Sequence, residues 1–292
     1  MFVATIGFFD GVHRGHTVLI DKVREEAERE GKGSMVLTMD CHPKTIVGGG
    51  YVPELLTTTE ERLQLLRRTG VDHVEVLHFD AELAKMDAPT FMRRVLKERY
   101  GIETLLMGYD HRFGHGGGRN EDYVRWGEEC GIRVLRAEQM EGEHVSSSEI
   151  RRMLHEGDVA GAAQLMGHPY VLTGVIEKGH RIGRTLGFPT ANMRMDQNKL
   201  VPAKGVYAVE TDLGHGIMNI GNRPTMNNGG NQTVEVHILD YCGDLYDTEL
   251  QVWFVDRIRS EQNFPDVTLL KEQIQRDVDA ALRCFAAPNE SM

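Results

Sequence analysis

The chain has few cysteines. Its 292 residues include only Cys41, Cys130, Cys242 and Cys284, which are widely scattered. Because no C-x-x-C pair occurs, the spacing indicates neither a zinc site nor a disulfide framework. Chains without disulfides are typical of reducing compartments. We therefore expect free thiols and a cytoplasmic location.

Long apolar runs and excess positive charge are also absent. No run approaches the roughly 20 apolar residues that cross a bilayer, and the start lacks a signal-peptide pattern. The net charge is −11, from 33 Lys and Arg against 44 Asp and Glu. This excess argues against nucleic acid or an anionic membrane as the main partner. We expect small-molecule partners, and no obligate protein partner is evident.

The first motif that the chain does contain is the stretch Gly7-Phe-Phe-Asp-Gly-Val-His-Arg-Gly-His16. Residues 2–6 before it are a short β-prone run, and residues 17–30 after it carry apolar residues at helical spacing. The stretch is therefore predicted to turn from a strand into a helix. Such a turn presents backbone N–H groups and the positive end of a helix dipole to an anion.

His13 and His16 add side-chain donors to this turn, and its glycines let a ligand approach the backbone. We interpret the stretch as a site for a nucleotide phosphate. Taken alone, it could equally be a tight βα turn with two surface histidines.

Strands and helices alternate through the first half of the chain. This alternation predicts a parallel sheet with helices on both faces, which binds ligands at the carboxyl ends of its strands. Strands are expected at residues 2–6, 34–40, 71–79, 103–107 and 132–135, and helices at residues 17–30, 58–70, 89–100, 121–130 and 146–154. Three further motifs fall at the same edge: Thr38-Met-Asp-Cys-His-Pro43, Gly108-Tyr-Asp-His-Arg-Phe-Gly114 and Val145-Ser-Ser-Ser-Glu-Ile-Arg151.

Together the four motifs resemble those of the HxGH nucleotidyltransferases, in the form found in the FAD synthetase module of bacterial bifunctional riboflavin kinase/FAD synthetases. The chain departs from that pattern at Phe8 (commonly Asn), Met39 (Phe), Cys41 (Pro), His111 (Phe) and Ser148 (Thr). The resemblance implies that His13, His16 and Arg151 act in catalysis. It implies nucleotide contacts by Gly7, Phe9, Asp10, Gly11, Gly15, Asp110, Arg112, Ser147 and Ser148, and flavin contacts by Asp40 and His42.

The second half has a different texture, with short β-prone runs separated by glycine. Strands are expected at residues 170–177, 205–211, 217–220, 233–239 and 250–254, which favours a small antiparallel barrel. An amphipathic helix at residues 266–285 follows them. We place the domain boundary near residues 160–168 and take the domains as 1–160 and 161–292.

The stretch from Gly174 to Asn192 resembles the riboflavin kinase signature, in which a Gly/Arg-rich loop leads into Gly-Phe-Pro-Thr-Ala-Asn. A glycine-rich hairpin loop would explain the glycines but not the Pro-Thr-Ala-Asn in register behind them. Thr190 and Asn192 offer hard oxygens suited to Mg²⁺ or to contacts with a ribose. Further matches at residues 202–207, 219–225, 234–246 and 258–264 extend the resemblance over nearly the whole chain.

This second resemblance also implies a set of binding residues. Nucleotide contacts are implied for Gly179, Arg181, Gly183, Arg184, Gly187, Pro189, Thr190, Asn192 and Tyr207, and flavin contacts for Arg223, Thr225, Arg259 and Phe264.

Glu235 is the expected catalytic base. It alternates with Val234 and Val236, so it points away from the core. On spacing alone a solvated strand residue is as good an interpretation, and the resemblance favours the base.

The resemblance thus implies ATP-dependent phosphorylation of riboflavin to FMN, and adenylylation of FMN to FAD with release of pyrophosphate. Two alternatives stay open. One is an HxGH transferase for another nucleotide acceptor, and the other is a flavin- or nucleotide-binding regulator without activity.

Overall fold

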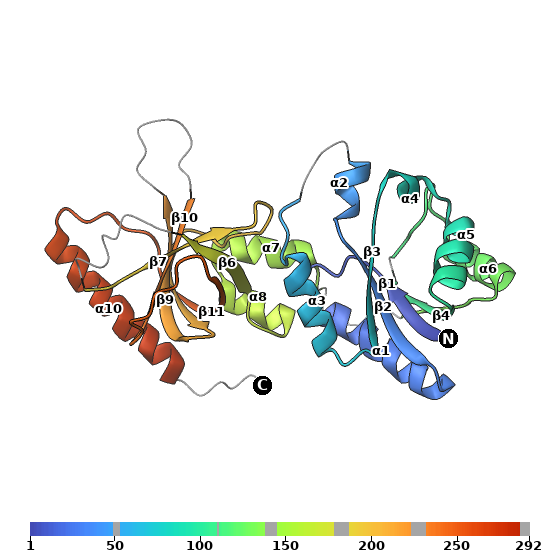
Figure 1. Ribbon diagram of the computed structural model, residues 1–292, viewed down its shortest axis with the longest axis horizontal. Coiled ribbons are helices and arrows are strands. Elements are labelled where there is room, and N and C mark those ends of the chain that lie inside the picture. Colours follow the sequence, from blue (N-terminus) through green and yellow to red (C-terminus); the bar gives the residue numbers. More distant parts are fainter. Residues whose placement is uncertain (49–52, 110, 138–144, 178–186, 223–231, 287–292) are drawn as a thin grey trace. The chain divides into compact units, whose positions relative to one another are not determined.

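The computed structural model describes residues 1–48, 53–109, 111–137, 145–177, 187–222 and 232–286. The chain divides into two compact units, Met1–Ser147 and Ser148–Met292 (Figure 1). This division lies before the boundary near residue 160 that the sequence favours, because two helices after Ser147 pack with the second unit.

The first unit contains a parallel sheet in the order β3-β2-β1-β4-β5. The sheet confirms the predicted strands. Their bounds are β1 Phe2–Ile6, β2 Gly33–Met39, β3 His73–Leu77, β4 Ile102–Met107 and β5 Arg133–Arg136. The strand order reverses at β1, which lies between β2 and β4. In open parallel sheets, ligands bind beyond the carboxyl ends of the strands at such a reversal.

Helices cover both faces of this sheet. Their bounds are α1 Arg14–Glu30, α2 Pro43–Val47, α3 Thr59–Arg68, α4 Ala81–Lys85, α5 Ala88–Phe91, the wider helical segment η1 Met92–Arg99 and α6 Asn120–Cys130. On one face Ile20 of α1 and Leu66 of α3 pack against Val36. On the other, Met92 and Tyr123 pack against Leu105. The two short helices α2 and α4 were not predicted, since neither is long enough to show an apolar period.

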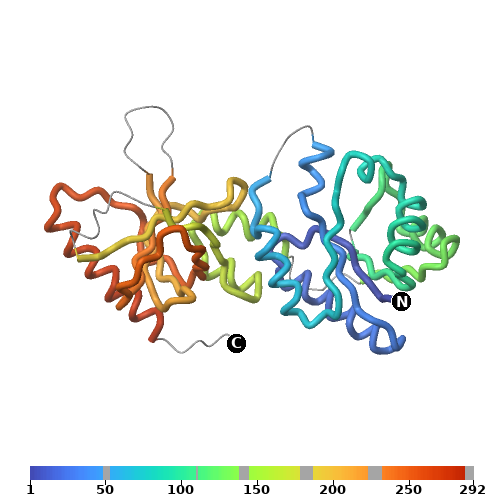
Figure 2. Tube along the Cα trace, viewed as in Figure 1, coloured from blue at the N-terminus to red at the C-terminus, as the bar shows by residue number. Residues whose placement is uncertain are grey.

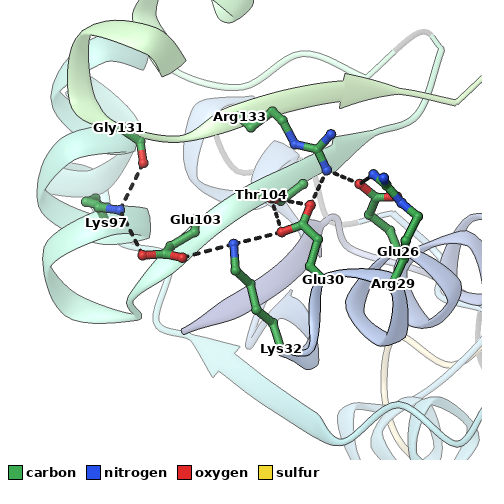
Figure 3. Close-up of polar contacts among 9 residues, drawn as sticks. All are labelled: Glu26, Arg29, Glu30, Lys32, Lys97, Glu103, Thr104, Gly131 and Arg133. Carbon is green, nitrogen blue, oxygen red and sulfur yellow. Dashed lines mark hydrogen bonds and ion pairs between the residues drawn. The ribbon is translucent and has the colours of Figure 1, made fainter.

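A polar network joins α1 to the amino-terminal ends of β4 and β5 (Figure 3). The ammonium of Lys32 lies 2.7 Å from Glu30 and 2.9 Å from Glu103. Arg133 pairs with Glu30 and with Glu26. Partly exposed ion pairs contribute little individually, up to about 1 kcal/mol each. Because this network lies at the amino-terminal ends, the opposite edge of the sheet is left to the predicted site residues.

The second unit contains a closed barrel in the order β10-β7-β6-β11-β8-β9. Its strands are β6 Val171–Glu177, β7 Ala191–Met195, β8 Gly205–Thr211, β9 Gly214–Asn222, β10 Gln232–Ile238 and β11 Glu249–Arg259. The antiparallel barrel is confirmed, although β7 was not predicted as a strand. Helix α10 (Val267–Ala286) runs beside the barrel (Figure 2), with Val278 and Ala281 packed against Val206.

Helices α7 (Ser147–Glu156) and α8 (Val159–Met166) pack with the barrel. The carbonyl of Leu154 in α7 accepts a hydrogen bond from the Ala203 amide at 3.0 Å. The Arg257 guanidinium of β11 donates to the Glu156 carbonyl at 3.0 Å. These hydrogen bonds join α7 to the second unit, and α8 packs against β11, so both helices except Ser147 belong to the second unit.

None of the described helices is both long and apolar enough to span a membrane. All four cysteines carry free thiols, and the cytoplasmic location stays a prediction.

Candidate functional site

The loop from Gly7 to His13, which we call the histidine loop, joins β1 to α1 and has an unusual backbone. Phe9 (φ 56°), Gly11 (φ 79°) and Val12 (φ 40°) all have positive φ. A positive φ is expected of glycine, but for a β-branched residue such as valine it is an outlier. Each non-glycine residue in this conformation raises the free energy of the folded state by on the order of 1–3 kcal/mol. The loop therefore keeps this shape only because its surroundings hold it.

His13 and His16 lie at the start of α1, as predicted. His13 is the N-cap residue, and its ring is stacked on that of His16, with centroids 3.6 Å apart and planes 17° apart. Burial and the neighbouring His13 hold the pKa of His16 well below its ordinary value. His16 is therefore neutral near pH 7 and acts as a hydrogen-bonding group rather than a cation. The pair lies at the amino-terminal end of a helix, where the helix dipole favours an anion.

Asp10 was predicted to contact the nucleotide, but its buried carboxylate is directed at the start of the third helix. It accepts hydrogen bonds from the amides of Leu56 and Thr57, each at 3.0 Å, and from the Thr57 hydroxyl at 3.0 Å. In this structure Asp10 anchors the loop, and its contact with a nucleotide stays a prediction.

The fourth motif meets the first through Ser147. Its hydroxyl donates to the Asp10 carbonyl at 3.2 Å. Gly15 lies close by, and a Cβ there would be 3.3 Å from the His13 ring and 3.6 Å from the Val145 carbonyl. The exposed Ser148 and the half-buried Arg151 follow on α7, in the second unit.

The second motif presents Asp40 and His42 beyond β2. Although burial opposes the effect, hydrogen bonds from the Phe79 amide and from His78 lower the pKa of Asp40. Asp40 in turn raises the pKa of His78. His42 caps α2, and its ring meets Phe8 edge-on with centroids 4.8 Å apart. Phe8, a departure from the family pattern, is therefore in contact with a predicted flavin residue.

The third motif is anchored by Tyr123 of α6. The Tyr123 hydroxyl accepts from the Phe113 amide at 3.0 Å and donates to the Phe113 carbonyl at 2.7 Å. His111 packs beside Phe113, with ring centroids 6.0 Å apart, and Arg112 is exposed.

Sequence reasoning missed Arg62, which is fully buried in α3. Its guanidinium donates to the Met39 carbonyl at 2.6 Å and lies 4.1 Å from the centre of the Phe8 ring. The helical spacing of the sequence could have indicated that Arg62 is buried. Arg62 precedes the buried Leu66 by four residues, so it stands on the apolar face of its helix.

In the second unit, the structure brings Thr190, Asn192 and Glu235 together. The Thr190 hydroxyl lies 3.4 Å from a carboxylate oxygen of Glu235. Asn192 of β7 is paired directly with Glu235 of β10. The alternation along β10 holds as predicted, with Val234 and Val236 buried and Glu235 half-buried.

The segment before Thr190 is fixed by His237. The Pro189 carbonyl lies 2.7 Å from Nδ1 of His237, and the Phe188 ring meets the His237 ring edge-on at 5.6 Å. Gly187 opens the segment at φ 87°. These contacts set the direction from which Thr190 reaches Glu235.

Two other predicted binding residues have structural partners within the second unit. Tyr207 is fully buried, and its hydroxyl donates to the Ala203 carbonyl. Arg259 makes a two-pronged ion pair with the buried Asp277 of α10, at 2.9 and 2.8 Å, and its guanidinium lies 5.7 Å from the Phe264 ring centre. Their ligand contacts stay predictions.

Seven predicted residues lie outside the described part of the chain. They are Asp110, Gly179, Arg181, Gly183, Arg184, Arg223 and Thr225.

Comparison with known proteins gives a consistent result for both units. The FAD synthetase family model matches residues 1–149, and the riboflavin kinase family model matches residues 166–285. The bifunctional riboflavin kinase/FMN adenylyltransferase of Escherichia coli K12 is 38% identical over 293 residues, covering 97% of this chain and 92% of the relative. The protein of the same description from Bacillus subtilis is 30% identical, with the same two coverages.

A solved structure shares the fold. The crystal structure of a protein from Streptococcus pneumoniae, described as a macrolide-efflux protein, matches with a TM-score of 0.84 and 27% identity. The match covers 96% of this chain and 93% of that one. Taken with the near-full-length relatives, the chain belongs to the bifunctional riboflavin kinase/FMN adenylyltransferase family.

Proposed function

We propose that the first unit makes FAD from FMN and ATP, and that the second unit makes FMN from riboflavin and ATP. The observation that carries this proposal is that the two family models fall on the two structural units. Each unit also holds a cluster of side chains suited to its reaction.

In the first unit, a phosphate oxygen of FMN attacks the α-phosphorus of ATP. The bond from that phosphorus to the bridging oxygen of the β-phosphate breaks, and pyrophosphate leaves. The imidazole N–H groups of His13 and of the neutral His16, at the amino-terminal end of α1, hydrogen-bond the phosphate oxygens whose charge develops. No covalent enzyme intermediate is needed.

In the second unit, the terminal hydroxyl of riboflavin attacks the γ-phosphorus of ATP, and ADP leaves. Glu235 takes the hydroxyl proton, since its carboxylate is half-buried beside the Thr190 hydroxyl.

The oxygen atoms of Thr190, Asn192 and Glu235 fit a magnesium ion. Mg²⁺ is usually held by one or two carboxylates together with substrate phosphates, rather than by a cage of protein ligands. Thr190 and Asn192 would hold the ion, which would supply positive charge to the phosphates of ATP.

Incubation with riboflavin, ATP and Mg²⁺, followed by separation of the flavins, tests the proposal directly. We expect FMN to appear first and FAD to follow, and supplied FMN to give FAD without riboflavin. FMN without FAD would favour an HxGH transferase for another acceptor. Flavin binding with neither product would favour a regulator without activity.

A further inference from the structure

The segment from Leu56 to Arg62 is in close contact with the histidine loop, and sequence reasoning gave it only the role of starting a helix. Thr57 makes the first connection. Its hydroxyl donates to the Asp10 carboxylate at 3.0 Å and accepts from the Gly11 amide at 3.1 Å. Thr57 and Leu56 are fully buried, and Asp10 is only 4% exposed. This bridge therefore joins the loop to the segment inside the protein.

Arg62 makes the second connection, at the other end of the segment. Its Nε donates to the Thr38 hydroxyl at 3.1 Å, and that hydroxyl donates on to the Phe8 carbonyl at 3.0 Å. The same guanidinium lies 4.1 Å from the Phe8 ring centre. Arg62 thus contacts the ring of Phe8 directly and holds the Phe8 carbonyl through the Thr38 hydroxyl.

The two connections enclose the strained part of the loop. Phe9 and Val12 have positive φ, and they lie next to Phe8 and Gly11, the residues that Arg62 and Thr57 hold. A Cβ on Gly11 would come within 2.8 Å of Leu56, so the packing there is tight. Strained backbone of this kind persists only where its surroundings over-determine it.

Stability alone does not account for Arg62. A buried charge is costly to desolvate, and replacing it with an apolar group of similar volume is often neutral or stabilising. Its Nη1 atom is buried without a hydrogen-bond partner in the described part of the chain, which adds to the cost. A role in holding the loop offers a reason for the guanidinium to be there.

We propose that Thr57 and Arg62 are positioning residues for adenylyl transfer, which fix the loop that carries His13 and His16. The inference rests on the proposed function of the first unit. Both residues act through the loop: Thr57 bonds to Asp10 and Gly11, and Arg62 lies against the Phe8 ring and reaches the Phe8 carbonyl through the Thr38 hydroxyl.

Four variants test this in the full chain. Thr57→Val keeps the volume and removes both hydroxyl bonds, whereas Thr57→Ser keeps them. Arg62→Met removes the charge, whereas Arg62→Lys keeps it. Thr69→Val and Arg68→Met are matched controls at the end of α3, since the Thr69 hydroxyl donates locally to the Leu66 carbonyl and Arg68 is exposed.

The readouts are turnover and KM for FAD formation from FMN, riboflavin phosphorylation in the same sample, and the number of ATP molecules bound per chain. Misplacing reacting groups by about 1 Å can cost about 10²-fold, so we expect Thr57→Val and Arg62→Met to lower FAD turnover by about 10- to 10²-fold. The KM values, ATP stoichiometry and kinase turnover should stay near those of the unaltered chain. Thr57→Ser should restore FAD turnover, Arg62→Lys should restore part of it, and both controls should be unaffected.

Normal FAD turnover in Thr57→Val and Arg62→Met would overturn the inference. So would a loss matched by an equal loss of ATP-binding sites, because that result would reflect unfolding of the first unit. If Thr57→Val does not fold, the comparison of Arg62→Lys with Arg62→Met decides. An unaltered chain that makes no FAD would instead show that the proposed function itself is wrong.

Discussion

The imidazole rings of His13 and His16 lie face to face, with centroids 3.6 Å apart. Two rings at this distance cannot both be protonated without strong repulsion, and burial further disfavours the charged form of His16. The pair therefore meets a phosphate with N–H groups rather than with two positive charges. Binding of an anion favours the protonated form, so ligand and proton should bind cooperatively.

His16→Ala should remove FAD formation while leaving riboflavin phosphorylation nearly intact. A lost donor to a developing oxyanion typically costs about 10²–10³-fold in turnover, and we expect at least this loss. Product analysis with FMN or riboflavin as substrate checks it. His73→Ala, which changes an exposed histidine of the same unit, serves as the control. Equal loss of both activities would contradict separate sites and indicate a folding defect.

The first unit should lose stability as the pH falls below about 6.5, the ordinary histidine pKa. Because the pKa of His16 is lowered in the folded state, the unfolded chain binds more protons in this range, and the free energy of unfolding decreases with falling pH. His78, whose pKa Asp40 raises, acts in the opposite direction. The stability that His78 contributes is fully present below about pH 6.5, and it is lost as the pH rises through the pKa of His78 in the folded protein.

Urea unfolding at several pH values, followed by Trp126 fluorescence in a Trp253→Phe background, measures this for the first unit. Introducing His16→Gln should flatten the decline below pH 6.5. Identical slopes with and without His16 would show that other groups cause the decline.

A fragment that begins at Ser148 should fold and make FMN without FAD. A fragment that begins at Gly167 should be less stable, because it lacks α7 and α8. Their buried side chains Leu154, Val159, Ala162 and Met166 would then be missing from the unit. Thermal melting and kinase assays of both fragments check this. Equal melting temperatures would mean that the two helices contribute little to the barrel.

Glu235→Gln should lower riboflavin phosphorylation by about 10²–10⁴-fold, the usual contribution of a general base. The change keeps size and hydrogen bonding, so ATP and flavin binding should change little. Adenylylation of supplied FMN should be untouched, and Glu249→Gln, on an exposed residue of β11, should affect neither reaction. Because proton removal can come late in a loose transition state, a smaller loss is compatible with the mechanism. Near-normal kinase turnover would show that Glu235 is a binding or structural residue.

The periodic parts of the chain were predictable from the sequence. The apolar runs of β1, β2 and β4 and the stripe of α1 are local patterns, and they suffice for the parallel sheet. Strand β7 was missed because it is short and its place in the barrel depends on pairing with β6 and β10.

The positions of the site residues were predictable in part. The cluster of Thr190, Asn192 and Glu235 follows from motifs that lie far apart in sequence. The structural partners of Asp10, Tyr207 and Arg259 did not follow from the sequence, since a motif does not tell which way a polar side chain turns. Each has a partner from another segment: Thr57, Ala203 and Asp277.

The closed barrel also has a consequence for the order in which the chain folds during synthesis. Strand β6 pairs with β11, so the ring is completed only when the chain has been made through Arg259. All strands of the parallel sheet, by contrast, are present once Arg136 has left the ribosome. Pairing of distant strands is slow, and domains generally fold as they emerge. We therefore expect that, in nascent chains stalled before β11, the first unit resists protease whereas the barrel segment is still cleaved. Protease resistance of both units at that chain length would contradict this order.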